Sequence, residues 1–207
     1  PDVADSRTAT YVSGDNSTEL VSQYTIQPGD NDTNGISIEA NTLALNSGTI
    51  RDASGNYATI THSLVDNNSS YKVDTTAPTA NFTKATDNVG TVTGDFTSDN
   101  TTDDTALVLS GTNESGSSVK VYHNTTELGT ATAVSTTSWS YTATVVNGTT
   151  HQFNVKETDL AGNTSAATSY FTVTGDTTAP AVNFTAATDD VGTVQGALTS
   201  GNTTDDT

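Results

Sequence analysis

Short acidic segments recur along this chain, and they are its main candidates for chemistry. Residues 52–56 and 159–163 both have the form Asp-x-x-Gly-Asn, and residues 87–90 read Asp-Asn-Val-Gly. Carboxylate and amide oxygens in irregular loops are the ligands that calcium prefers. The alternative is that these Asp and Asn side chains only make turns by bonding their own backbone. We favour the turn for a single segment, and calcium where several segments meet.

A repeated pentapeptide indicates where they meet. Asp-Thr-Thr-Ala-Pro occupies residues 74–78 and returns 102 residues later at 176–180. When residues 74–105 are aligned with 176–207, 24 of the 32 pairs are identical. A period of this length indicates tandem domains rather than a solenoid of small repeats. Proline fixes its own φ and extends the residue before it, and threonine also favours extended backbone, so the pentapeptide predicts a stiff joint.

Stacked end to end, such domains would bring three acidic segments to each joint. We expect the Asp-x-x-Gly-Asn loop of the upstream domain to meet the joint aspartate, Asp74 or Asp176. The first acidic loop of the downstream domain, at Asp87 or Asp189, would join them. Two unpaired carboxylates about 4 Å apart repel by about 4 kcal/mol at an effective dielectric of about 20, so we expect a cation among them. Cysteine is absent and the three histidines are scattered in sequence, which leaves zinc without a ligand set.

Two further acidic clusters allow more than one interpretation. The first recurs in part in the second copy and consists of Asp99, Asp103 and Asp104, then Asp205 and Asp206. It could cap a strand in solvent or hold a second ion, and we favour the ion. Residues 30–35 begin like an EF-hand loop, but Asn41 stands where that loop needs a bidentate glutamate. For residues 30–35 we therefore predict a hairpin turn.

Composition argues against several classes of function. The formal net charge is −18, with 24 acidic residues against 6 Lys and Arg, so nucleic acid and an anionic membrane are not expected as partners. No run of apolar residues approaches the length of a membrane span. The sequence has no Gly-x-Ser-x-Gly elbow, no phosphate-binding glycine loop and no His-Glu-x-x-His. We expect no catalytic residues and no enzyme.

The apolar residues alternate in short runs between turn residues, a pattern typical of strands. Between the two joints we expect about seven strands in about a hundred residues, which predicts an all-β, immunoglobulin-like β-sandwich. Trp139, the only tryptophan, is predicted to pack in its core. The predicted core is Leu107, Leu109, Val119, Val121, Leu128, Trp139, Tyr141, Phe153, Val155, Phe171 and Val173.

The repeat divides the chain unevenly. Residues 74–175 are one complete unit, and residues 176–207 are the opening part of the next copy. Residues 1–73 show strand patterns between residues 8 and 61 and are predicted to be the C-terminal part of a preceding domain. We therefore expect tandem sandwiches joined end to end, in an excerpt of a longer protein.

These segments resemble the bacterial Ig-like extender repeats of giant Gram-negative surface adhesins of the RTX and Bap type. The resemblance rests on the joints, on Thr-Thr-Asp-Asp-Thr at residues 101–105, and on Glu-Thr-Asp-Leu-Ala-Gly-Asn-Thr-Ser at residues 157–165. It covers nearly the whole chain, with residues 8–78 similar to a second Ig-like subtype whose opening strands they lack.

The resemblance implies a structural extender on the bacterial cell surface, outside the cell, that supports cell adhesion or biofilm formation. Its partners would be neighbouring Ig-like repeats of the same chain, with calcium stiffening the joints. By this resemblance the calcium ligands are Asp52, Asp74, Asp87, Asp103, Asp104, Asp159, Asp176, Asp189, Asp205 and Asp206.

Two other functions stay open. The Thr-rich surface could belong to a module that binds carbohydrate or ice, although the threonines follow no short period and most of the few aromatic residues fall at core positions. Alternatively, residues 176–207 of one chain could complete residues 1–73 of the next, which would make the protein a self-associating subunit of an extracellular filament.

Overall fold

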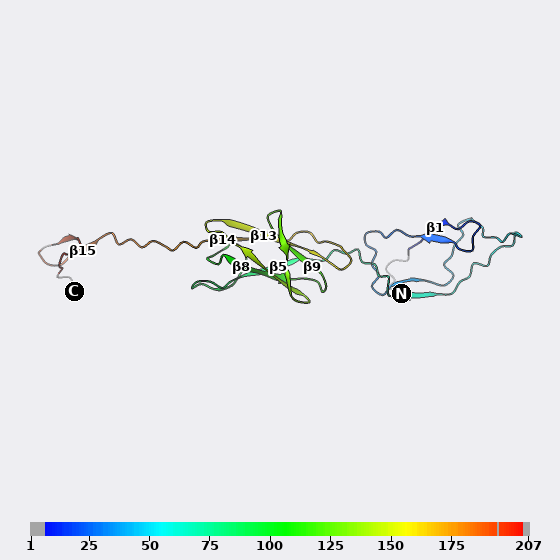
Figure 1. Cartoon of the computed structure of the whole chain (residues 1–207), viewed down its shortest axis with the longest axis horizontal. Helices are drawn as coiled ribbons and strands as arrows, with labels where there is room; N and C mark the ends of the chain where they lie inside the picture. The colour runs from blue at the N-terminus through cyan, green and yellow to red at the C-terminus, as the bar shows by residue number, and fades with distance from the viewer. Residues whose placement is uncertain (1–6, 194, 205–207) are drawn as a thin grey trace. The chain divides into compact units, whose positions relative to one another are not determined.

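The computed structural model describes residues 7–193 and 195–204, which form strands, turns and extended segments (Figure 1). Within this part of the chain no helix has the length and apolar character that a membrane crossing needs. Two compact units are present, Pro1–Asp176 and Thr177–Thr207. The all-β prediction is confirmed.

Residues 81–175 contain two five-stranded sheets. The first has the order β10-β9-β13-β14-β7, with β14 and β7 parallel and the other neighbours antiparallel. Its strands are β7 Asn100–Thr102, β9 Ser118–His123, β10 Thr126–Thr130, β13 Thr150–Thr158 and β14 Phe171–Gly175. The second has the antiparallel order β11-β12-β8-β5-β6. Its strands are β5 Asn81–Asp87, β6 Gly94–Phe96, β8 Ala106–Thr112, β11 Thr132–Ser135 and β12 Ser138–Thr144.

One hydrophobic core lies between these sheets. Alternate residues of β8 and β12 in one sheet, and of β9 and β13 in the other, point inward because successive side chains of a strand face opposite sides. Trp139 is 2% exposed, as predicted, and its indole N–H donates to the Asn81 carbonyl at 3.2 Å. The buried side chains are Ala85, Leu107, Leu109, Val119, Val121, Trp139, Ala143, Val145, Phe153, Val155, Phe171 and Val173.

Two predicted core residues differ from expectation. Leu128 is 40% exposed, because β10 is the edge strand of its sheet and its register with β9 shifts between Glu127 and Gly129. An irregularity of this kind bends an edge strand and redirects its side chains. Tyr141 is only partly buried, and its hydroxyl donates to the Leu128 carbonyl at 3.1 Å.

Residues 7–73 form two separate two-stranded sheets. The strands are β1 Thr10–Ser13 with β2 Val21–Gln23, and β3 Ile36–Ile38 with β4 Val65–Asn68. All four strands are exposed along their length, since two-stranded ladders have no facing layer on which to bury side chains. Strand patterns were predicted as far as residue 61, but no strand forms between residues 39 and 64, and β4 lies beyond the predicted stretch.

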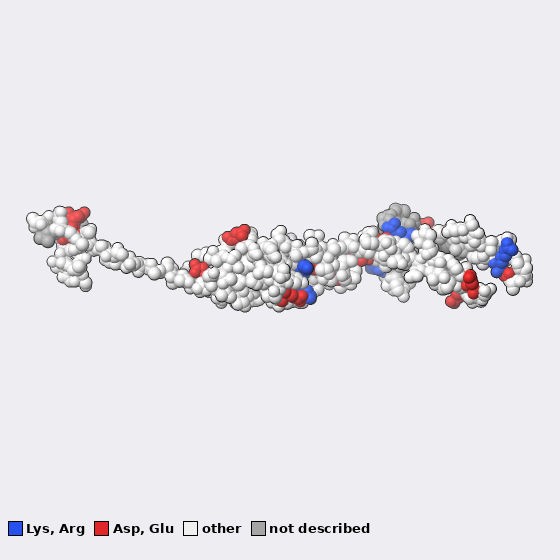
Figure 2. All heavy atoms as spheres, turned by 90° about the horizontal axis from the view of Figure 1, so that it is seen from above, with Lys and Arg blue, Asp and Glu red and all other residues white. Residues whose placement is uncertain are grey.

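The second unit repeats the opening hairpin of the complete domain. β15 Ala187–Asp189 pairs with β16 Gly196–Leu198, and Asp189 lies opposite Gly196. Asp87 lies opposite Gly94 in the same way, so the two hairpins share one register 102 residues apart. The face drawn in Figure 2 is mostly uncharged, with its acidic side chains in small separate groups.

Candidate functional site

The two Asp-x-x-Gly-Asn loops have the same internal structure. In the second, Asn163 donates its backbone N–H to Asp159 Oδ1 and its side-chain amide to Asp159 Oδ2, each at 2.8 Å. Asp52 and Asn56 make the same two bonds, at 2.9 and 2.7 Å. The bonds from the asparagine hold the pKa of each aspartate below its usual range. Each aspartate therefore closes its own loop as an anion.

The second of these loops contacts the joint that precedes its domain. The side-chain amide of Asn163 also donates to the backbone carbonyl of Asp74 at 3.1 Å. We expected the Asp159 loop to reach the following joint, at Asp176, and this part of the prediction is wrong. The Asp159 loop therefore lies at the end of the domain that follows the Asp74 joint. The chain after the loop must run back along the sandwich before it reaches Asp176.

The upstream side of the same joint uses residues 29–31. Asn31 accepts from the Thr75 N–H at 2.9 Å, and its amide lies 2.9 Å from the Thr76 hydroxyl. The Thr75 hydroxyl accepts from the Gly29 N–H at 2.8 Å and donates to the Asp30 carbonyl at 3.1 Å. The Asp52 loop was expected here. The Asp52 carboxylate instead accepts from Ser54 and Asn56, inside its own loop.

A second acidic group lies where β5 ends. Asp87 and Asp104 are 6% and 2% exposed, and both contact Thr102. The Thr102 hydroxyl donates to Asp87 Oδ2 at 2.6 Å and accepts from the Asp104 N–H at 3.1 Å. The Asp176 N–H donates to the Thr102 carbonyl at 2.9 Å. The Asp87 loop therefore lies beside the joint that follows the domain, which reverses its expected place.

Asp103 belongs to the same group. A Cβ built on Gly90 would lie 2.2 Å from Asp103 Oδ2, so the carboxylate packs directly over the Gly90 backbone, whose φ is +73°. Asp99 is bonded to a different strand, since its N–H donates to the Thr172 carbonyl at 2.7 Å. Thr102, the centre of the group, was missed by the sequence analysis, although it recurs as Thr204.

The second copy reproduces part of this arrangement. Asp189 is 6% exposed and accepts from the Val191 N–H at 3.3 Å, as Asp87 does from Val89 at 2.9 Å. Asp205 and Asp206 lie outside the described residues. Across residues 7–193 and 195–204, no three or more His, Asp or Glu side chains are grouped so that they could hold a metal ion.

Comparison with known proteins places the complete domain in a family. The sequence model described as "Bacterial Ig-like domain" matches residues 74–177. The chain belongs to the bacterial Ig-like domain family. Proteins of this family are typically not enzymes, and such domains are common in extracellular or surface proteins. No curated protein and no solved structure is significantly similar to the chain.

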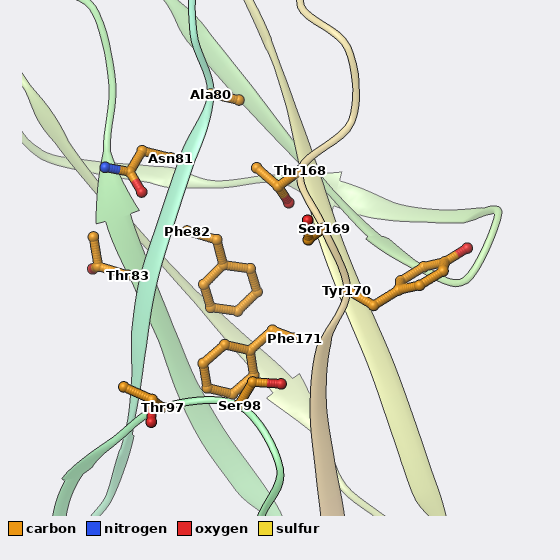
Figure 3. Close-up of a pocket in the computed structure, with 10 residues that line it drawn as sticks. All are labelled: Ala80, Asn81, Phe82, Thr83, Thr97, Ser98, Thr168, Ser169, Tyr170 and Phe171. Carbon is orange, nitrogen blue, oxygen red and sulfur yellow. The ribbon is translucent and has the colours of Figure 1, made fainter.

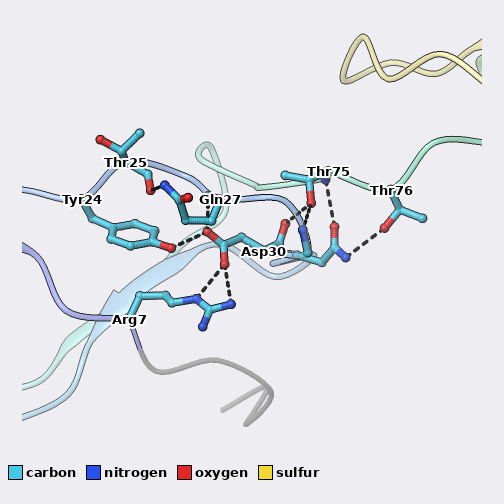
Figure 4. Close-up of polar contacts among 9 residues, drawn as sticks. Arg7, Tyr24, Thr25, Gln27, Asp30, Thr75 and Thr76 are labelled. Atoms are coloured by element: carbon cyan, nitrogen blue, oxygen red, sulfur yellow. Dashed lines mark hydrogen bonds and ion pairs between the residues drawn. The ribbon is translucent and has the colours of Figure 1, made fainter.

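Outside the bacterial Ig-like domain, the EF-hand-like segment forms a turn in which Asp32 accepts from the Gly35 N–H, but the predicted hairpin is wrong, because the flanking strands β2 and β3 belong to different sheets. Both carboxylate oxygens of Asp30 are occupied: Oδ1 accepts from Arg7 at 2.6 Å, and Oδ2 from the Tyr24 hydroxyl at 2.6 Å and the Gln27 N–H at 2.7 Å (Figure 4). The Gln27 N–H, followed by the Tyr24 and Arg7 bonds, lowers the pKa of Asp30. Because one of these donors is the Arg7 guanidinium, the Asp30 carboxylate already has a positively charged partner and needs no ion.

Two of the three histidines are neighbours in the bacterial Ig-like domain, which their separation in sequence did not suggest. The His123 and His151 rings lie 5.1 Å apart on adjacent strands. His151 accepts from the Val146 N–H at 3.0 Å and is 6% exposed. Burial, and the neighbouring His123, lower the pKa of His151. The lowered pKa therefore favours the neutral form of His151 inside the sandwich.

A shallow groove crosses the bacterial Ig-like domain between β5 and the segment before β14 (Figure 3). Its floor is the stacked pair Phe82 and Phe171, whose ring centroids are 4.5 Å apart with an angle of 7° between planes. The ring of Tyr170 points away from this pair. Phe171 is 5% exposed and Phe82 is partly buried against the core, so little of this aromatic surface faces the groove.

Proposed function

We propose that this chain is a structural extender of a bacterial surface adhesin, and that calcium stiffens the joints between its domains. The bonds around residues 74–76 are the observation that carries the proposal. Asn31 and Asn163, 132 positions apart in the printed sequence, each hydrogen-bond this short linker. A linker bonded along its length has few conformations, so the segments on either side of it are restrained.

Calcium is supported by the carboxylates next to Asp176. Asp87 and Asp104 are both almost fully buried, and no ion pair joins either one to Lys or Arg in the described parts of the chain. Burying an unpaired charge is costly, and a cation bound by several carboxylates removes the cost. Asp103 packs over Gly90, and the Asp176 N–H bonds the Thr102 carbonyl, so both belong to this acidic group. At the preceding joint, Asp74 and Asp159 would play this part.

An extender needs no ligand pocket, because its function is to set the distance between the cell and a binding domain. Each bacterial Ig-like domain would add one sandwich length between the cell and a distal binding domain, and the joints would prevent the array from folding back. Ca²⁺ outside cells would hold every joint in its extended state. The same chemistry explains the marked excess of acidic over basic residues.

Small-angle scattering of the full chain, with calcium and with excess EDTA, tests the proposal. We expect the maximum dimension to shrink and the spread of conformations to widen on chelation. At a calcium concentration of 100 times Kd, binding to the native state alone would contribute about 2.7 kcal/mol of stability. The Asp103→Asn/Asp104→Asn variant should lose the calcium effect at the joint around Asp176 and keep it at the joint around Asp74.

The control is Asp66→Asn, which removes an exposed aspartate from β4 and should respond to calcium like the parent chain. Identical scattering profiles in calcium and in EDTA would refute the calcium part. A chain that is compact in both conditions would refute the extender itself.

A further inference from the structure

A buried carboxylate in the complete domain has no cationic partner. Glu157, on β13, is 0% exposed. Its Oε1 accepts from the Glu114 N–H and lies 2.5 Å from the Ser117 hydroxyl, but its Oε2 has no hydrogen-bond partner. Among residues 7–193 and 195–204, no Lys or Arg forms an ion pair with it.

A second unpartnered oxygen belongs to the same cluster. Asn113 Oδ1 is buried without a partner, while its amide group donates to the Glu114 carbonyl at 2.8 Å and approaches the Ser117 hydroxyl at 3.3 Å. The side chains of Asn113 and Glu157 therefore both approach the Ser117 hydroxyl. Buried oxygens without partners are rare in folded proteins and often mark an ion or a water.

The backbone around Glu157 prevents its escape to solvent. Its N–H donates to Ser165 Oγ at 3.0 Å, and its carbonyl accepts from the Ser165 N–H at 2.8 Å. The loop at residues 113–117 covers the carboxylate, and Leu160 packs against Gly116 of that loop. The carboxylate is thus held in place by two segments distant in sequence.

From these contacts we propose that Glu157 and Asn113 bind a divalent cation inside the domain, with calcium as the ion that fits. A water could donate to both oxygens, but it would leave a negative charge buried without compensation. A cation satisfies both oxygens and neutralises the charge. The unpartnered donors are a carboxylate oxygen and an amide oxygen, hard ligands that suit calcium and not zinc.

This site goes beyond the proposed function, because it needs no neighbouring domain. It would fasten the loop at residues 113–117 to the base of the Asp159 loop. Calcium would then stabilise the sandwich itself, whether or not it also stiffens the joints.

Isothermal titration of the full chain with Ca²⁺ tests the site. We expect Glu157→Gln, which keeps the size of the side chain, to bind one Ca²⁺ per chain fewer than the parent. Glu127→Gln, an exposed acid of β10, is the matched control and should keep every equivalent. Trp139 fluorescence, which reports on this domain alone, checks that each variant is folded.

A second variant decides the matter even if Glu157→Gln does not fold. Asn113→Asp adds a carboxylate at the site, so calcium should bind severalfold more tightly and raise the Trp139-monitored melting temperature by more than in the parent. Without a cation, the added charge would only repel Glu157, and calcium would not rescue it. That result, or an unchanged stoichiometry in folded Glu157→Gln, would overturn the proposal.

The background Asp74→Asn/Asp176→Asn separates this site from the joints. Both joint aspartates are exposed, so their replacement should be tolerated. If Glu157 holds its own ion, the background still loses one equivalent when Glu157→Gln is added. Failure of the joint proposal would leave this difference intact.

Discussion

The side-chain amide of Asn163 donates a hydrogen bond to the backbone carbonyl of Asp74 at 3.1 Å, across 89 positions of sequence. The same asparagine closes its own loop on Asp159. One side chain thus connects the internal geometry of a loop to the linker in front of the domain. The position of the linker depends on the loop being formed.

Replacing Asn163 with Ala should therefore release the linker. We expect Asn163→Ala to cost about 1 kcal/mol more than Asn56→Ala, since net loss of one hydrogen bond costs about that much. Asn56 makes the same bonds within its loop, so it serves as the control. Urea unfolding measures the cost. Faster hydrogen exchange at the Thr75 and Thr76 amides would report the release directly, and unchanged exchange would contradict it.

The two copies of one phenylalanine should behave differently. Phe82 stacks on Phe171 and packs edge-to-face with Trp139, with the ring centroids of Phe82 and Trp139 5.5 Å apart. Phe184, by contrast, is 81% exposed. We expect Phe82→Ala to destabilise the complete domain by about 3 kcal/mol or more, as truncation of a packed phenylalanine does. Phe184→Ala should change stability by less than about 0.5 kcal/mol. Chemical denaturation followed by Trp139 fluorescence compares them, and equal losses would show that residues 177–204 also pack on a core.

The complete domain should lose stability in mild acid. The folded-state pKa of His151 is lowered from 6.5 by burial and by His123. The folded domain therefore binds this proton less readily than the unfolded chain, so stability is full above about pH 6.5 and falls as the pH drops below it. His151→Gln should flatten this decline in melting temperature, while His62→Gln, in the first part of the chain, should not. A parent chain equally stable on both sides of that pH would rule out the effect.

The core should not accept a methyl group at Gly111. A Cβ there would lie 2.0 Å from the Asn81 carbonyl oxygen and 2.7 Å from Trp139 Cζ2. We expect Gly111→Ala to cost about 1 to 3 kcal/mol or more, because backbone and indole must both move. Gly148→Ala is the control: nothing lies within 4 Å of its Cβ, and it carries only the strain of a φ of +71°, about 1 to 2 kcal/mol. A smaller loss at Gly111 than at Gly148 would contradict the packing described.

Much of the fold was predictable because it is local. Alternation of apolar and polar residues marked β8, β9, β12, β13 and β14, since a strand in a sandwich buries every second side chain. Nine of the eleven predicted core residues are buried. The prediction that Leu128 is buried was wrong, because the alternation of residue types does not reveal that a strand lies at the edge of a sheet and is irregular there.

Residues 7–73 were harder to predict for a related reason. Their runs of β-branched and apolar residues have strand propensity, but propensity becomes structure only where a partner strand and a facing layer exist. Tyr57, for example, makes an isolated bridge to Arg51 in place of a strand.

The sequence by itself determined that acidic loops and proline joints repeat and that the domain is a sandwich. Only the tertiary structure decided which joint each loop serves. Asp87 follows Asp74 closely in sequence, but β5 lies between them, and seven extended residues span about 23 Å at about 3.3 Å each. A strand carries the chain from one end of a sandwich to the other, so a loop close to a joint in sequence can lie at the far end of the domain in space.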